Sequence, residues 1–147
     1  MTRPVTPLLA ADCIIRLNGR TDRVVLIERL NPPHGLALPG GFVDEGESVE
    51  AAAVREAREE TSLHVELLVL LGIYSAPGRD PRGATASAVY VADASGDPGA
   101  DDDAAATFVV NPADRDLWLA FDHRRILDDY MHWLATGEPA PLRIERA

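Results

Sequence analysis

Three glutamates, Glu56, Glu59 and Glu60, crowd one short stretch of the sequence. In a helix, residues three or four positions apart lie on the same face, so these carboxylates would stand close together. Like charges at that spacing destabilise a helix by about 0.2–0.5 kcal/mol for each pair. Magnesium would offset the repulsion, because it prefers oxygen ligands and commonly bridges carboxylates to substrate phosphates. The spacing therefore indicates either a metal site or the solvated acidic face of a helix.

The residues before this cluster favour the metal site. Pro39-Gly40-Gly41 interrupts regular structure and allows the backbone to approach a bound group closely. A second acidic group follows within residues 44–47. Ser48 is suited to cap a helix, which the alanine, glutamate and arginine content predicts over Val49–Thr61. This loop and helix could aim carbonyl and carboxylate oxygens at one point.

The stretch from Gly41 to Leu63 resembles the Nudix box, usually written G-x5-E-x7-R-E-U-x-E-E-x-G-U, where U is a bulky aliphatic residue. Six fixed positions match at the spacing of that family: Gly41, Glu47, Arg55, Glu56, Glu59 and Glu60. Two positions differ, since Ala57 replaces a bulkier residue and Ser62 stands where the family has glycine. Because serine does not favour the left-handed backbone conformation, we expect a slightly altered helix end and an intact metal site.

The resemblance implies a set of metal ligands. Glu59 and Glu60 would bind the ion, Glu56 would be a further ligand or the general base, and the carbonyl oxygen of Gly40 would complete the shell. The implied cofactor is Mg²⁺, with Mn²⁺ as an alternative, and the number of ions is left open.

The resemblance also implies supporting and catalytic roles. Glu47 and Arg55 would orient the cluster through hydrogen bonds, which fix the geometry of metal ligands. Gly41 would lie against the substrate. The chemistry would be attack of water on one phosphorus of a diphosphate, with metal ions neutralising the phosphate charge, lowering the pKa of the water and stabilising the leaving group.

A second segment, Tyr74–Gly83, carries the clue to the substrate. Arg79 and Arg82 are cations on a proline-containing loop, suited to a phosphate or a ribose phosphate. The segment reads YSAPGRDPRG and resembles the stretch after the box in ADP-ribose pyrophosphatase-like Nudix proteins, as does FDHRRIL at residues 121–127. The implied reaction converts ADP-ribose to AMP and ribose 5-phosphate. A solvated loop with incidental arginines is the alternative interpretation.

Several positions leave the substrate and the base open. Ala76 and Ala84 stand where such relatives often carry Asp and His, and Ala106 aligns with their extra catalytic glutamate. The general base is therefore either Glu56 or a carboxylate of the acidic loop Asp97–Asp103. The alternative functions are a nucleoside triphosphate pyrophosphohydrolase that removes damaged nucleotides, and a non-catalytic Nudix module that senses a nucleotide.

Composition limits the class of protein. The chain has 147 residues and a formal charge of −10, which argues against binding a nucleic acid backbone. No apolar run approaches the roughly 20 residues of a membrane span, and the N-terminal apolar stretch is too short for a signal peptide. We therefore expect a cytoplasmic protein that binds a small nucleoside diphosphate derivative. The single cysteine, Cys13, excludes an internal disulfide and is expected to be buried and unreactive.

The remaining patterns predict strands with two covering helices. The predicted strands are Leu8–Leu17 and Val24–Arg29, joined as a hairpin by residues 18–22, and then Val65–Tyr74, Thr85–Ala92 and Thr107–Val110. Asp122–Leu134 has helical periodicity. We expect one domain over residues 1–147, with 138–147 as a loose tail. The resemblance implies an α/β (α+β) fold, an α/β/α sandwich around a mixed β-sheet. It is also compatible with a homodimer, for which the apolar N-terminal strand is a candidate interface.

Overall fold

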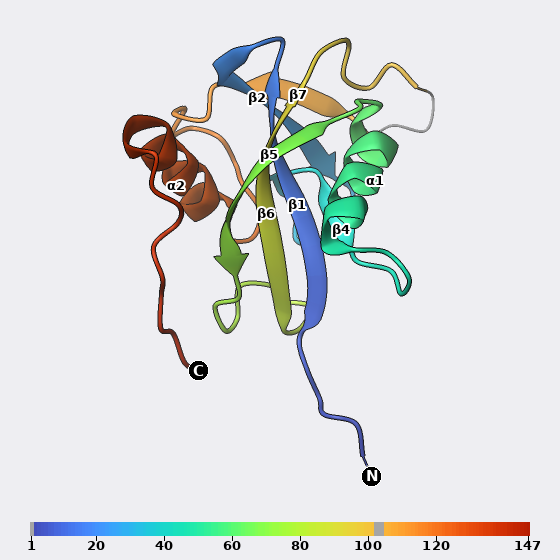
Figure 1. Ribbon diagram of the computed structural model, residues 1–147, viewed down its shortest axis with the longest axis vertical. Helices are drawn as coiled ribbons and strands as arrows, with labels where there is room; N and C mark the ends of the chain where they lie inside the picture. The colour runs from blue at the N-terminus through green and yellow to red at the C-terminus, as the bar shows by residue number, and fades with distance from the viewer. Residues whose placement is uncertain (1, 102–104) are drawn as a thin grey trace.

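A computed structural model describes residues 2–101 and 105–147 (Figure 1). Within these residues, seven strands form one sheet, and helices α1, Val49–Thr61, and α2, His123–Thr136, lie on either side of it. The strands are β1 Leu8–Leu17, β2 Arg20–Arg29, β3 Gly35–Ala37, β4 Gly40–Phe42, β5 Glu66–Tyr74, β6 Thr85–Ala94 and β7 Thr107–Val110. No helix in the described part of the chain is long and apolar enough to cross a membrane.

The sheet is mixed, as predicted. Its strand order is β3-β2-β1-β6-β5, with β4 also pairing with β1 and β7 with β2. β1 and β6 run parallel, from Leu8 opposite Thr85 to Leu17 opposite Ala94, and the other named pairs are antiparallel. The central strand of the domain is therefore the first strand of the chain. The predicted α/β/α sandwich is confirmed.

The first hairpin is tighter than predicted. β2 begins at Arg20, four residues before the predicted Val24, and only Asn18 and Gly19 connect it to β1. Their φ angles are 53° and 75°, in the left-handed region that asparagine and glycine tolerate. An Asn-Gly pair with two such φ angles is a compact turn whose twist matches that of the flanking strands.

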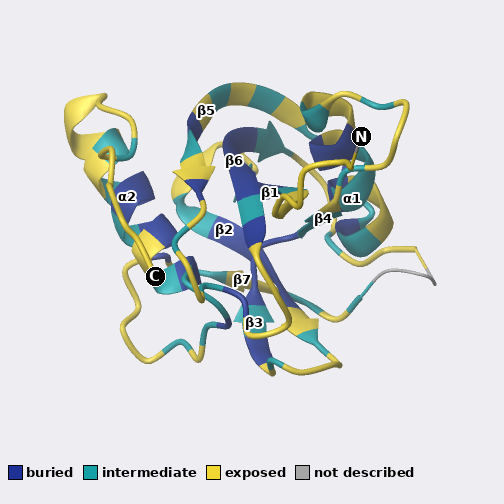
Figure 2. Ribbon diagram, turned by 90° about the horizontal axis from the view of Figure 1, so that it is seen from below, coloured by how far each residue is buried: buried dark blue, intermediate teal, exposed yellow. Residues whose placement is uncertain are grey.

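Two apolar layers pack against the sheet, one under each helix. Under α1 the contacts come from small residues, Ala52, Ala53 and Ala57, which let the helix backbone approach β1 closely. Under α2 they come from bulky ones, including Ile126 and Tyr130. Figure 2 shows the buried residues along the sheet and on the helix sides that face it. Both faces of the sheet are thus covered, and Ala57 fits its layer because of its small size.

β1 lies inside the domain. Cys13, Ile14 and Ile15 are fully buried, and the strand pairs with β6 along one edge and with β2 and β4 along the other. Leu8 and Leu9 at the start of the strand are exposed, so a dimer interface at this strand stays a prediction. Burial raises the pKa of the Cys13 thiol to about 12, in agreement with the predicted unreactive cysteine.

The chain after α2 runs back along the β5 side of the molecule. The backbone N–H of Ala140 donates to the carbonyl oxygen of Leu71 at 2.9 Å. Arg143 donates to both carboxylate oxygens of Asp129 at 2.9 Å, and the Tyr74 hydroxyl donates to the same carboxylate at 2.8 Å. Residues 138–147 contain no helix or strand, and these contacts join the segment to β5 and α2.

Helix α1 ends in the conformation that glycine usually supplies. Ser62 has φ 66° and ψ 8°, and its N–H donates to the carbonyl oxygen of Arg58 at 2.9 Å. The expectation of an altered helix end is therefore wrong. The Ser62 hydroxyl accepts the N–H of Asp101 at 2.9 Å, a contact that glycine would lack and that offsets part of the backbone strain.

Two substitutions at Ser62 separate these contributions. Both Ser62→Gly and Ser62→Ala remove the hydroxyl contact, but only alanine keeps a Cβ in the left-handed region, which costs about 1 kcal/mol. We expect Ser62→Gly to be more stable than Ser62→Ala by about 1 kcal/mol in urea unfolding. Equal stabilities of the two variants would contradict the observed helix end.

Candidate functional site

A cavity of about 280 Å³ opens where β1, β4 and α1 meet the loop that follows β5. Its wall carries both acidic and basic side chains. The acidic residues come from β1, α1 and the loop, and the basic ones from β2 and the loop. The charged lining residues are Asp12, Glu56, Glu60, Arg29, Arg79, Asp80 and Arg82. The cavity thus brings part of the predicted metal cluster and both predicted substrate arginines together.

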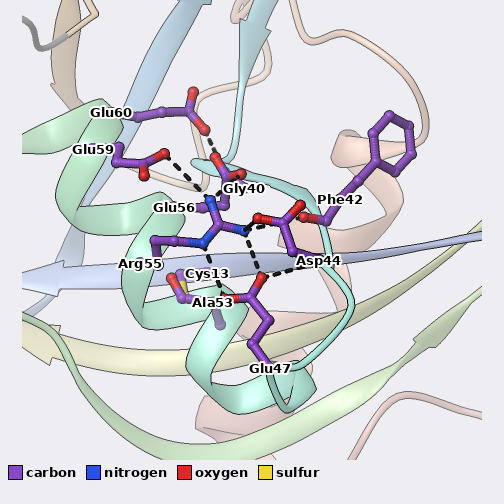
Figure 3. Close-up of polar contacts among 10 residues, drawn as sticks. All are labelled: Cys13, Gly40, Phe42, Asp44, Glu47, Ala53, Arg55, Glu56, Glu59 and Glu60. Atoms are coloured by element: carbon purple, nitrogen blue, oxygen red, sulfur yellow. Dashed lines mark hydrogen bonds and ion pairs between the residues drawn. The ribbon is translucent and has the colours of Figure 1, made fainter.

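Arg55 connects the carboxylates of the box (Figure 3). Its Nε and Nη2 donate to Glu47 at 3.0 and 2.6 Å, and its Nη1 donates to Glu56 at 2.9 Å and to Glu59 at 3.3 Å. Nη2 also donates to the carbonyl oxygen of Phe42 at 3.2 Å. One guanidinium therefore ties the loop before α1 to two successive turns of the helix.

The contacts between Arg55 and Glu47 shift the pKa values of both groups. Hydrogen bonds from Arg55, followed by one from the N–H of Asp44, lower the pKa of Glu47 to about 2. The same contacts with Glu47 and Glu56 raise the pKa of Arg55. Glu47 is therefore ionised at any physiological pH and holds the arginine in place, which is the orienting arrangement that the sequence predicts.

Glu60 is partly buried, whereas the adjacent Glu59 is exposed. Its Oε1 accepts the backbone N–H of Gly40 at 2.9 Å. Burial raises the pKa of Glu60 to about 8, opposed by the Gly40 contact and increased further by the charges of Glu56 and Asp12. The side chain of Glu59, in contrast, is 58% exposed, contacts Arg55 and does not line the cavity. The two predicted metal ligands thus occupy different environments.

Gly40 and Gly41 lie in β4, which pairs with β1, so the expected interruption of regular structure is wrong at these two residues. At both positions the backbone lies too close to a neighbouring carboxylate for a residue that carries a side chain. A Cβ at Gly41 would lie 2.6 Å from the carboxylate of Glu56, and one at Gly40 would overlap the carboxylate of Asp12. Both glycines are needed because two carboxylates press against the backbone of β4.

Asp12 is a site residue that the sequence analysis did not identify. It is 8% exposed, it accepts a hydrogen bond from the hydroxyl of Ser87, and it lines the cavity beside Glu56. Burial is the main cause that raises its pKa to about 6. The one signal in the sequence is its charge, since Asp12 interrupts the apolar run from Leu8 to Ile15 and such a buried charge is costly.

The two predicted substrate arginines differ in their contacts. Arg79 is 5% exposed at its side chain, donates to both oxygens of Asp122 at 3.0 and 2.7 Å, and donates to the hydroxyl of Thr85 at 3.0 Å. Arg82 pairs with Asp80 at 2.9 Å and is 47% exposed. Arg79 is thus held by protein groups, and substrate binding by either arginine stays a prediction.

The residues fit a divalent cation by their chemistry. Glu56, Glu60 and Asp12 offer oxygen ligands in the cavity, and their crowding contributes to the raised pKa of Glu60. No three acidic, histidine or cysteine side chains in the described part of the chain converge as a ready-made metal cage. Here Arg55 engages Glu56 and Glu59, and Gly40 engages Glu60.

The second candidate for the general base falls partly outside the described residues. Asp102 and Asp103 belong to that undescribed segment, whereas Asp97 is exposed and the Asp101 N–H binds Ser62. The carbonyl oxygen of Ala106 accepts the N–H of Glu28 at 3.0 Å. The choice between Glu56 and a carboxylate of the Asp97–Asp103 loop stays open.

Comparison with known proteins supports the resemblance to the Nudix box. The model of the NUDIX domain family matches residues 6–134. An ADP-ribose pyrophosphatase of Methanocaldococcus jannaschii is 46% identical over 132 residues, which cover 86% of this chain and 75% of that protein. The chain is also similar to a mutT/nudix family protein from Listeria innocua, with 35% identity, a TM-score of 0.75, and 90% and 98% of the two chains covered.

A further similar structure contains a ligand. It is the NUDIX domain of Shewanella oneidensis NrtR in complex with ADP ribose, with 27% identity, a TM-score of 0.75, and 88% of this chain and 90% of that chain covered. Fold, box and family model agree, and the chain therefore belongs to the Nudix family.

The ionisation of Glu60 predicts how stability depends on pH when no metal is present. The pKa is about 8 in the folded protein against an ordinary value of 4.5 for glutamate, so between these values the folded state holds a proton that the unfolded chain has lost. The free energy of unfolding must then fall as the pH rises through this range. Glu60→Gln cannot titrate, and its side-chain carbonyl can still accept the Gly40 N–H.

We expect the melting temperature of Glu60→Gln, relative to wild type, to rise by about 3 °C or more between about pH 5 and about pH 8 in excess EDTA. Glu66→Gln, an exposed change at the start of β5, is the matched control and should show no such trend. A difference between Glu60→Gln and wild type that is the same at both pH values would contradict the raised pKa.

Proposed function

We propose that this Nudix pyrophosphohydrolase hydrolyses ADP-ribose to AMP and ribose 5-phosphate, using Mg²⁺. The observation that carries the proposal is a single cavity lined both by carboxylates of β1 and α1 and by three arginines, Arg29, Arg79 and Arg82. Metal cations held by the carboxylates, together with the arginines, can balance the negative charge of a diphosphate. A chain of charge −10 would otherwise repel this substrate. The pyrophosphatase of Methanocaldococcus jannaschii and the NrtR complex favour ADP-ribose among the diphosphates.

The residues of the box would bind the cation and position its ligands. Glu60, Glu59 and Glu56, with the carbonyl oxygen of Gly40, would hold the cation. When bound, the cation would lower the pKa of water and neutralise the phosphate oxygens. Arg55 would position Glu56 and Glu59, because it already donates to both carboxylates.

Proton transfer needs a carboxylate near the attacking water. Glu56 meets the geometric requirement, since it lines the cavity and lies against the backbone of Gly41. The Gly41 backbone, in turn, would contact the substrate next to the bond that is broken. Glu56 is therefore the base that we propose, with the Asp97–Asp103 loop as the alternative source.

A substrate panel tests the reaction. Purified protein is assayed with ADP-ribose and with nucleoside triphosphates, including oxidised ones, in magnesium and in manganese, and the products are identified by mass. We expect preferential turnover of ADP-ribose with AMP and ribose 5-phosphate as products. A preference for triphosphates would replace this substrate with the nucleotide-sanitising alternative, and turnover of no diphosphate would favour the sensing module.

Variants of the cluster test the mechanism. Glu56→Gln and Glu60→Gln should each lower kcat by about 100-fold or more, because each removes a charge at the reacting centre. Glu45→Gln, an exposed change in the loop before α1, serves as the control and should keep wild-type kcat. Full turnover by both cluster variants would show that the carboxylates of α1 do not carry the chemistry.

A further inference from the structure

Arg29 is the one arginine of the cavity that the sequence analysis passed over. It ends β2, and its Nε donates to the carbonyl oxygen of Pro33 at 2.7 Å. Within the described residues, its guanidinium makes no other hydrogen bond and no ion pair. The bond to Pro33 fixes one edge of the group and leaves the remaining N–H donors available to a ligand.

The other two arginines are already engaged. Arg79 is paired with Asp122, and Arg82 with Asp80. In the described part of the chain, Arg29 is therefore the only cavity arginine without a carboxylate partner. Withdrawing a charged side chain even partly from water is costly unless it is paired, which makes the position of the half-buried Arg29 unusual for a purely structural residue.

Aromatic contacts hold two of these cations near one another. The guanidinium carbon of Arg29 lies 4.8 Å from the centre of the Phe121 ring, and that of Arg82 lies 5.5 Å from the same ring. Arg82 also lies 5.8 Å from the Phe42 ring. The rings attract both cations, although the cations repel each other.

Direct ion pairs distinguish Arg29 from the other two arginines. Arg79 is paired with Asp122 and Arg82 with Asp80, whereas the described residues give Arg29 no such partner. The carboxylates of Asp80, Glu60 and Asp12 act on Arg29 without contacting it, and burial and repulsion from Arg82 lower its pKa. A bound anion would give Arg29 a direct partner and would face a planar fork of donors suited to phosphate oxygens.

We propose that Arg29 binds a phosphate group of the substrate, with Arg82 beside it on the Phe121 ring. This assignment rests on the proposed function, because both concern one cavity. It places the principal phosphate-binding cation on β2, not at Arg79, whose guanidinium is occupied by Asp122 and Thr85. Arg29 would act in binding and not in the chemical step, since Arg55, and not Arg29, is hydrogen-bonded to the carboxylates of the box.

Steady-state kinetics of Arg29→Gln and Arg29→Lys test the assignment. We expect Arg29→Gln to raise KM for ADP-ribose by about tenfold or more with kcat within about threefold of wild type. Arg29→Lys keeps the charge but loses the fork, so its KM should lie between the two. Arg23→Gln is the matched control, because Arg23 also lies on β2 but pairs with Asp22 and does not line the cavity.

Binding measurements separate the two possible phosphates. AMP and ribose 5-phosphate are titrated calorimetrically into wild type, Arg29→Gln and Arg23→Gln, with magnesium present. Weaker binding of AMP alone would assign Arg29 to the adenosine phosphate, and weaker binding of ribose 5-phosphate alone to the other phosphate. Unchanged binding of both compounds to a folded Arg29→Gln would overturn the proposal.

Failure of this inference is distinguishable from failure of the proposed function. If wild type prefers another nucleoside diphosphate derivative, the substrate proposal fails, and the KM comparison is repeated with that compound. An unchanged KM, or a loss confined to kcat, then overturns the role of Arg29 alone. If Arg29→Gln does not fold, as judged by its melting curve, Arg29→Lys carries the test, and an unchanged KM in that variant overturns the role.

Discussion

The site depends on one arginine that holds together carboxylates which would otherwise repel. Arg55 donates to Glu47 on the loop and to Glu56 and Glu59 on α1, so that one guanidinium holds three carboxylates in place. The arrangement keeps several carboxylates close together, which a site for divalent cations requires. It also attaches the loop before α1 to the helix, so the box behaves as one unit.

The sheet supplies the second constraint. β4 is only three residues long, yet its pairing with β1 places Gly40 opposite Asp12 and sets Gly41 against Glu56. The cavity is therefore built from three segments that are distant in sequence, the first strand, the box and the loop after β5. Small residues on β4 and on the sheet side of α1 allow these segments to lie close together. Packing of the core and assembly of the site therefore both require small residues at these positions.

Features encoded locally could be predicted from the sequence, and features created by distant pairing could not. The bounds of α1 were predicted because Ser48 caps a stretch of strong helix formers, and the spacing of the box identified Arg55 and its carboxylates. Asp12 carried only its charge as a signal and Arg29 carried none, because both enter the cavity through the pairing of β1 and the course of β2. The conformation of Ser62 was predicted wrongly, since the hydroxyl contact with Asp101 lies 39 residues away.

The parallel pairing of β1 with β6 has a consequence for synthesis on the ribosome. Leu8 pairs with Thr85 and Leu17 with Ala94, so β1 leaves the ribosome well before its partner β6. Until β6 emerges, β1 can pair only with β2 and β4, and the N–H and C=O groups along its other edge have no strand to pair with. Such long-range pairing slows folding and exposes aggregation-prone surface, because the chain between β1 and β6 must close into a loop before the two strands can pair. The domain must therefore be completed late, when β6 and finally α2 have emerged.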